Sequence, residues 1–341
     1  SEIVFDLTSD TLRFNRTFSY KNHNYIPESF QREMLRGLKL KGSAKLVYDK
    51  EFKSAEVVIE NGEVRSKMHP MKLEGLAGTI KYSDNRIRLR TLTGKMNKNE
   101  FTISLGYFLG DNMAEAKKDN RFTLRAKYLN LDELLDYDVT KVARKKKKDT
   151  LNVNVIAPIE TVKAHDSIFN VFSLPFSNMK IKLDIGELLY HKIIINKLKA
   201  RMRMQKNHYF YIDTLGMDIA DGHIDIDGVF NGSDPENIHF SPNIKLKDVD
   251  LAKLMVRFEN FGQDYVLSDN IKGHISGKLS GKLLMHTDLI PKMDQSEIKM
   301  ETMMVNGELN NYAPMLMMKE YFKDKNLNNI RFDTLSNTFD I

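Results

Sequence analysis

Four aspartates spaced along one short segment are the residues of this chain best suited to binding a metal ion. They are Asp218, Asp221, Asp225 and Asp227. Their spacing does not match the twelve-residue calcium-binding loop. Asp225 and Asp227 alternate with isoleucines, which is typical of the solvent-facing side of a strand. We therefore expect no metal site, and nothing in the sequence indicates a cofactor.

Residues arranged for catalysis are equally scarce. The sequence has no Gly-x-Ser-x-Gly elbow, no His-Glu-x-x-His motif and no phosphate-binding glycine loop. The histidines are scattered, and His223 and His274 stand in alternating segments where a surface position is the simpler expectation. Cysteine is absent, which excludes a disulfide framework and thiolate metal sites. We expect a protein that is not an enzyme.

The net charge of +6 raises the question of an anionic partner. Its densest feature is the run Lys145 to Lys148, which follows Arg144 and is typical of a solvated loop. Binding of nucleic acid would depend on this run and on tyrosine-containing strands such as residues 209–211. Because no nucleic-acid-binding module is recognisable, we expect no nucleic acid partner.

The apolar residues indicate a different chemistry, the binding of acyl chains. They alternate with polar residues, as Ile181 and Leu183 alternate with Lys180 and Lys182, so each strand has one apolar and one wet face. An apolar row left open would recover about 0.8 kcal/mol per buried CH₂ of a lipid tail. The candidate wall residues are Ile87, Leu89, Ile103, Leu105, Ile181, Leu183, Ile224, Ile226, Ile275 and Leu279. The same rows also suit ordinary packing against a second sheet or helices, and the pattern leaves both possibilities open.

Mainly β structure is predicted around these residues, as a long antiparallel meander. Turn signals separate the strands, for example Asp84-Asn85, Asn61-Gly62 and Asp221-Gly222. Short helices are expected over residues 129–135, 249–255 and 312–322, and a further one over Glu28 to Leu35. Glycines punctuate the strand pattern of residues 271–283, where they permit sharp twist or close backbone approach. No stretch reaches the apolar length of a membrane-spanning helix.

One cassette occurs three times at nearly constant spacing. Each copy begins with a Gly-Glu-aliphatic step and ends on a strand-like hexapeptide that closes with Thr-Leu. The copies run from Gly62 to Leu92, from Gly186 to Leu215 and from Gly307 to Leu335. Repetition of this kind predicts one elongated body of stacked units, approximately residues 1–137, 138–261 and 262–341. Both ends stop within an alternating pattern, so we expect a fragment of a longer chain.

Two stretches of the chain resemble the AsmA-like family of bacterial envelope proteins. The first runs from Asn178 through Gly222-His223-Ile224-Asp225-Ile226-Asp227-Gly228 and is similar to the family's repeating unit. The second runs from Lys272 to Ile341 and is similar to its C-terminal region, where a glycine-rich strand leads to Asn306-Gly307-Glu308-Leu309. The chain departs from the family in lacking an N-terminal membrane helix.

This resemblance implies a fold and a role. The family resembles bridge-like lipid-transfer proteins, in which a long antiparallel sheet curls into a taco-like β-groove. The implied function is that of a lipid-binding groove segment in a periplasmic protein, anchored to the inner membrane by a segment outside this sequence. It would move phospholipids or other acyl-chain lipids between inner and outer membranes, support outer-membrane biogenesis and have an outer-membrane protein as a further partner. The alternative is a non-conducting structural or protein-interaction scaffold of the cell envelope.

Overall fold

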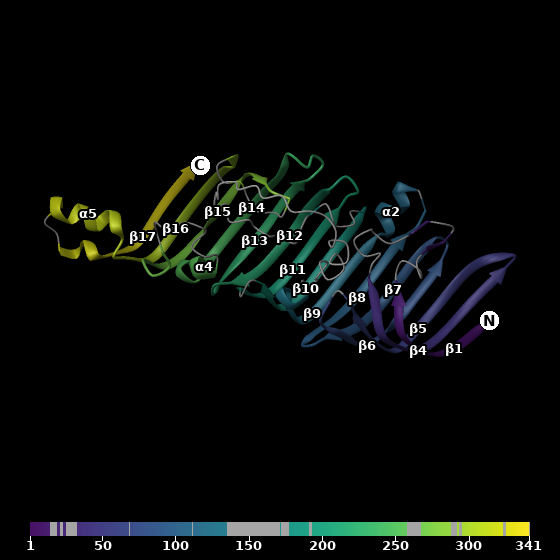
Figure 1. Ribbon diagram of the computed structural model, residues 1–341. Helices are drawn as coiled ribbons and strands as arrows, with labels where there is room; N and C mark the ends of the chain where they lie inside the picture. Colours follow the sequence, from purple (N-terminus) through teal and green to yellow (C-terminus); the bar gives the residue numbers. More distant parts are fainter. Residues whose placement is uncertain are drawn as a thin grey trace, which may run out of the picture.

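The architecture comes from a computed structural model, which describes residues 1–13, 19–20, 23–24, 33–67, 69–110, 112–134, 171, 177–190, 193–257, 267–287, 292, 295–322 and 325–340. These residues form a mainly β protein with a few short helices, as the alternating pattern predicts. The strands lie side by side in chain order, and the two ends of the chain lie at opposite ends of the molecule (Figure 1).

Fifteen of the strands form one open sheet. Its first half consists of β1 (Glu2–Arg13), β4 (Met34–Asp49), β5 (Glu51–Ser66), β6 (Lys72–Ser83), β7 (Arg86–Met96), β8 (Asn99–Phe108) and β9 (Arg121–Asn130). Its second half consists of β10 (Met179–Tyr190), β11 (Ile193–Met204), β12 (Tyr209–Ile219), β13 (Gly222–Asn231), β14 (Ile238–Asp250), β15 (Ile271–Met285), β16 (Glu297–Asn310) and β17 (Asn329–Asp340). At about 4.8 Å between neighbouring strands, the sheet extends roughly 65 Å across them.

The remaining elements are small. The strands β2 (Ser19–Tyr20) and β3 (His23–Asn24) pair only with each other. The helices are α2 (Met113–Asp119), α3 (Leu131–Leu134), α4 (Leu251–Arg257), α5 (Ala313–Phe322) and the 3₁₀ turn η6 (Lys325–Asn328). Among the described residues no second large sheet lies against the first. No helix in the described ranges is long and apolar enough to cross a membrane.

Consecutive strands are joined by tight turns whose residues suit them. Asp84 and Asn85 connect β6 to β7 with positive φ angles of 51° and 55°, and Ala220 and Asp221 connect β12 to β13 with 48° and 62°. Two positive φ angles in a two-residue loop match the twist of the flanking antiparallel strands, and Asn and Asp tolerate this region better than most residues. The predicted turn at Asp84-Asn85 agrees with the structure, and the one predicted at Asp221-Gly222 lies one residue earlier, since Gly222 begins β13.

The meander is broken once, where β9 and β10 pair in parallel. The prediction of an uninterrupted antiparallel meander is therefore wrong at this point. Parallel neighbours require a long return connection, and residues 131–178 provide one between these strands. The Lys145 to Lys148 run lies in this connection, outside the described residues, as do both proposed unit boundaries at residues 137–138 and 261–262.

Helices occur near most of the positions expected from the sequence. Helix α3 lies within residues 129–135, α4 begins two residues after Val249, and α5 lies within residues 312–322. The helix expected over Glu28 to Leu35 is wrong at its end, because Met34 and Leu35 begin β4; residues 28–32 lie outside the described part. Helix α2 was not expected, although Asn112 caps it by accepting hydrogen bonds from the backbone N–H groups of Ala114 and Glu115.

Candidate functional site

The pairing register aligns apolar side chains into one row across ten consecutive strands, β7 to β16. Directly opposed residues of neighbouring strands project from the same face of a sheet, so one row defines that face along the whole series. In order, the row consists of Leu92, Ile103, Leu124, Leu183, Ala200, Leu215, Ile226, Ile244, Leu279 and Met300. We call this set the apolar row. It extends about 43 Å at the usual strand spacing.

All ten candidate wall residues project from the face that carries the apolar row. Ile103, Leu183, Ile226 and Leu279 belong to it. A second row parallel to the first is formed by Leu89, Leu105, Phe122, Ile181, Met202 and Ile212. The other candidates occupy alternate positions of the same strands: Ile87, Ile224 and Ile275. Whether they contact lipid stays a prediction.

Most side chains of this face are only half-buried. Every member of the apolar row except Ala200, which is 2% exposed, retains intermediate exposure. Of the ten candidates, Ile224 alone is buried, at 7% exposure, and it packs in a cluster with Val249 and Leu254. Ile224 is therefore the candidate least able to contact a ligand.

Short helices cover parts of the apolar face near the strand ends. Leu254 of α4 belongs to the cluster around Ile224, and Leu131 and Leu134 of α3 pack against the cluster that contains Leu188. A third cluster joins Val171, Phe230, Ile238 and Met285 at the opposite strand ends. Six members of the apolar row belong to or pack against the first two clusters: Leu124, Leu183, Ala200, Leu215, Ile226 and Ile244. Of these six, all but Ala200 nevertheless remain half-buried.

Four of the six repeated Gly-Glu and Thr-Leu motifs lie at or next to irregular positions within strands, whereas those at Gly186 and at Thr334-Leu335 keep a regular register. Register shifts interrupt β7 between Leu89 and Leu92, and β12 between Ile212 and Leu215. A shift in β16 coincides with Asn306, whose φ is 51°, just before Gly307. Such β-bulges bend a strand and increase its twist. Part of the repeated cassette therefore coincides with points where strands bend.

Gly62 corrects one turn prediction, because Asn61-Gly62 lies inside β5 and not between strands. The pairing of β4 with β5 shifts between Lys41 and Gly42 of β4, opposite this part of β5. A Cβ atom at Gly62 would lie 2.8 Å from Cδ2 of Leu40 and 2.9 Å from Cβ of Leu76. Glycine is needed here for close side-chain packing over the bend.

The opposite face of the sheet is polar and carries the charged groups. Arg203 forms a bidentate pair with Asp213, with Nη2 to Oδ1 at 2.7 Å and Nε to Oδ2 at 3.0 Å. Lys197 Nζ lies 2.8 Å from Asp218 Oδ2, and His223 Nδ1 lies 2.6 Å from Asp218 Oδ1. The bonds from Lys197 and His223 hold the pKa of Asp218 below its usual value, and the bond to Asp218 raises the pKa of His223.

The aspartates considered for metal binding form such local contacts. Asp225 and Asp227 are exposed, and Asp227 accepts a hydrogen bond from Asn243 at 2.9 Å. Asp221 pairs with Lys253. Within the described ranges, no three acidic or histidine side chains gather as a metal-ligand set. His274 lies on β15, directly opposite Val305.

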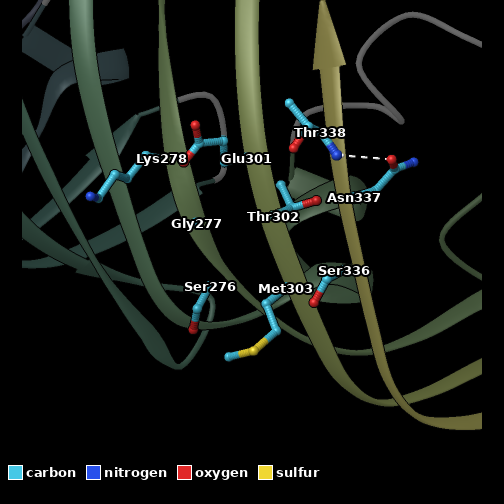
Figure 2. A pocket seen from close by; sticks show the side chains of 9 residues that line it. All are labelled: Ser276, Gly277, Lys278, Glu301, Thr302, Met303, Ser336, Asn337 and Thr338. Carbon is cyan, nitrogen blue, oxygen red and sulfur yellow. Dashed lines mark hydrogen bonds between the residues drawn. The ribbon is translucent and has the colours of Figure 1, made fainter.

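The depressions of the surface are shallow and lined mainly by polar residues. Figure 2 shows one across β15, β16 and β17, in which Lys278 and Glu301 form one edge and Ser276 and Ser336 the other. Met303 lies in this polar lining and is 46% exposed, whereas the adjacent Met304 is 7% exposed and on the apolar side. The two methionines therefore project from opposite faces of the sheet, as consecutive strand residues do.

Sequence reasoning missed six of the ten members of the apolar row. The six that were not among the candidates are Leu92, Leu124, Ala200, Leu215, Ile244 and Met300. Ile244 and Leu124 stand in visibly alternating segments and could have been found. Leu215 follows a bulge, so simple alternation counted from Ile212 places it on the wrong face.

Comparison with known proteins adds no relative. No family model, no curated protein and no solved structure matches this chain.

Proposed function

We propose that the apolar face binds the acyl chains of phospholipids and lets them move along the sheet. In this proposal the sheet curls into a taco-like β-groove whose inner face carries the apolar row. The chain is a lipid-binding segment and not an enzyme. It forms part of a periplasmic protein anchored to the inner membrane through a segment outside this sequence.

The observation that carries the proposal is the continuity of the apolar row. Ten strands contribute an aliphatic or thioether side chain at matching positions, including across the parallel junction between Leu124 and Leu183. The described residues form no second large sheet, and nine members of the row remain half-buried. A protein core of this extent would normally be covered by a second layer. An apolar ligand supplies that layer in our account.

The energetics suit binding without a fixed site. Burial yields about 0.8 kcal/mol per CH₂, so contact along a 16-carbon tail yields roughly 10 kcal/mol before the costs of ordering it. Because successive strands offer equivalent aliphatic contacts, a tail displaced by one strand exchanges one set of contacts for a similar set. The polar headgroup would remain near water, since the described apolar row offers it no charged partner.

The bends at the repeated motifs support a curled groove. Bulges near Gly62, between Leu89 and Leu92, between Ile212 and Leu215, and at Asn306 occur in strands spread along the sheet. Bulges at such positions are a usual means of curving a sheet. The resemblance to the AsmA-like family supports the same geometry. It also supports transport between inner and outer membranes, a part in outer-membrane biogenesis, and an outer-membrane protein as a partner.

A second candidate function is a non-conducting scaffold of the cell envelope. The observation that favours it is the cover provided by α3 and α4, whose Leu131, Leu134 and Leu254 pack onto the apolar face. In this alternative the face is an ordinary core, and no lipid occupies it.

Lipid extraction from protein purified without detergent distinguishes the two functions. Under the first, folded protein carries phospholipid, and Ile226→Asp removes most of it, because a carboxylate in contact with an acyl chain is strongly unfavourable. Under the second, folded protein carries no stoichiometric lipid, and Ile226→Asp chiefly lowers stability. Mass spectrometry of the extract, with circular dichroism of each sample, decides between them.

A further inference from the structure

The polar face carries a dense group of cations in its middle part, from β7 to β11. Its members are all exposed: Arg88, Arg90, Arg121, Arg125, Lys180, Lys182, Lys199 and Arg201. We call them the basic band. They occupy the side of the sheet opposite the apolar row, since each alternates in its strand with residues of that face. This group is separate from the Lys145 to Lys148 run.

The cations of the basic band have no side-chain partner among the described residues, and the band contains a single acid. None of its eight side chains forms an ion pair or hydrogen bond with another side chain in the part of the chain that the structure describes. Like charges even lie directly opposite each other, with Arg121 facing Lys180 and Lys182 facing Arg201. Opposed like charges destabilise a sheet. The one acid within the band is Asp184, which lies between Arg125 and Lys199.

Elsewhere the same polar face also contains pairs of opposite charge. Lys45 faces Glu56, which in turn faces Lys81, and Lys81 Nζ lies 2.7 Å from Glu56 Oε1. Towards the other end, Lys278 faces Glu301 and Lys272 faces Glu308. Alternating charges of this kind neutralise each other across the strands. Lys278 also faces Lys245, so opposed cations are not confined to the band. The band differs in gathering eight exposed cations around a single acid, Asp184.

The arrangement of the band favours a broad anionic surface as its counterpart. Cations on β9, β10 and β11 repeat across neighbouring strands, at about 4.8 Å, and cations of the band also repeat along a strand, at roughly 6.7 Å for alternate residues. Small residues such as Ser104 and Thr123 stand between them, with no aromatic side chain inside the band for base stacking. The neighbouring depression that includes Arg125 is also lined by Glu63, Glu74 and Glu100, which do not suit a single bound phosphate.

We propose that the basic band docks the polar face of the sheet onto a membrane surface rich in anionic phospholipids. Headgroup phosphates form a two-dimensional array of negative charge, and each Lys or Arg near such a surface strengthens association. Docking through this face leaves the apolar row, on the other side, free. The inference does not rest on lipid binding by the apolar face and stands or falls separately.

Vesicle co-sedimentation of the full chain tests the inference. The probes are phosphatidylcholine vesicles with and without phosphatidylglycerol, at low and at high salt. The variant Lys182→Gln/Arg201→Gln neutralises two cations of the band. The matched control Lys278→Gln/Lys282→Gln removes the same charge from the same face outside it. Circular dichroism and the urea midpoint confirm that both are folded.

Wild-type protein is expected to bind only the anionic vesicles and to dissociate at high salt. Each cation near the membrane contributes about fivefold to the affinity for anionic vesicles. The band variant should therefore bind these vesicles at least tenfold more weakly than wild type, whereas the affinity of the control variant should fall less than about threefold. Equal binding to neutral vesicles, or equal losses in both variants, would overturn the inference. So would band-dependent binding of a duplex RNA without any binding to anionic vesicles, which would assign the band to nucleic acid.

Discussion

Leu124 of β9 and Leu183 of β10 lie directly opposite each other across a parallel strand pair. This pair carries the apolar row over the point where the antiparallel meander is interrupted. Had β10 been offset by one residue, all of its apolar side chains would project from the polar face. The register of this junction is therefore what makes the face continuous.

Charge on the apolar row should prevent lipid loading, while the same charge on the neighbouring position should not. Leu279→Asp places a carboxylate in the row, and Ser280→Asp places one on the exposed polar face of the same strand. We expect Leu279→Asp to reduce bound lipid at least tenfold, because an unpaired charge against acyl chains is strongly unfavourable. Ser280→Asp should retain wild-type loading. Lipid per protein is measured by extraction and mass spectrometry, and equal loss in both variants would count against the face assignment.

Substitution of an apolar side chain by alanine should lower the free energy of unfolding most where the apolar face is covered. Ile238 is 0% exposed within a cluster, whereas Ile226 in the central row is half-buried. We expect Ile238→Ala to lower the free energy of unfolding by about 2–5 kcal/mol, and Ile226→Ala to cost much less in lipid-free protein. Urea titration measures both values. Equal losses of unfolding free energy in the two variants would mean that the side chains around Ile226 are packed like a closed core. That result would favour the scaffold function.

Gly307 should not accept even a methyl group while Phe332 is present. A Cβ atom built at Gly307 collides with the Phe332 ring, which lies over the glycine. We expect Gly307→Ala to destabilise the protein by about 1–3 kcal/mol through overpacking. Adding Phe332→Ala should recover part of this loss in a double-mutant cycle measured by urea unfolding. Strict additivity of the two changes would show that the ring does not cover Gly307.

The charge cluster on β12 and β13 should make stability depend on pH. Because Asp218 raises the pKa of His223 in the folded state, the protonated histidine stabilises the fold below its unfolded pKa of about 6.5. This contribution is lost as the pH rises through the higher folded value. The side chain is 41% exposed, so the effect should not exceed about 1 kcal/mol. Wild-type protein should lose stability relative to His223→Gln between about pH 6 and pH 8 in urea titrations. If the stabilities of the two proteins changed with pH in parallel, the ion pair between His223 and Asp218 would be contradicted.

Local alternation was sufficient to predict the strands and their faces. In β10, Ile181 and Leu183 alternate with Lys180 and Lys182, and the structure places the two sets on opposite faces. Turn-forming residues identified the β6–β7 and β12–β13 connections. Turns, like alternation, depend only on residues adjacent in the sequence.

Features set by distant strands could not be predicted in this way. The parallel pairing of β9 with β10 depends on the path of residues 131–178, which carry no local signal for strand order. Bulges shift the apparent phase of Leu215, and the Asn61-Gly62 pair resembles a turn although it lies within β5. The basic band also becomes visible only after register brings Lys182 opposite Arg201.

Site-specific photocrosslinking is the most direct test of the apolar row as a lipid path. A benzophenone side chain is introduced singly at Ile226, Ile244 or Leu279 in the row, and at the adjacent polar-face positions Asp225, Lys245 or Lys278, which lie outside the basic band. The protein is then illuminated with a radiolabelled phospholipid. We predict phospholipid adducts from all three row positions and none above background from their neighbours. Folded protein that yields no adduct from the row, or equal adducts from both faces, would contradict the account.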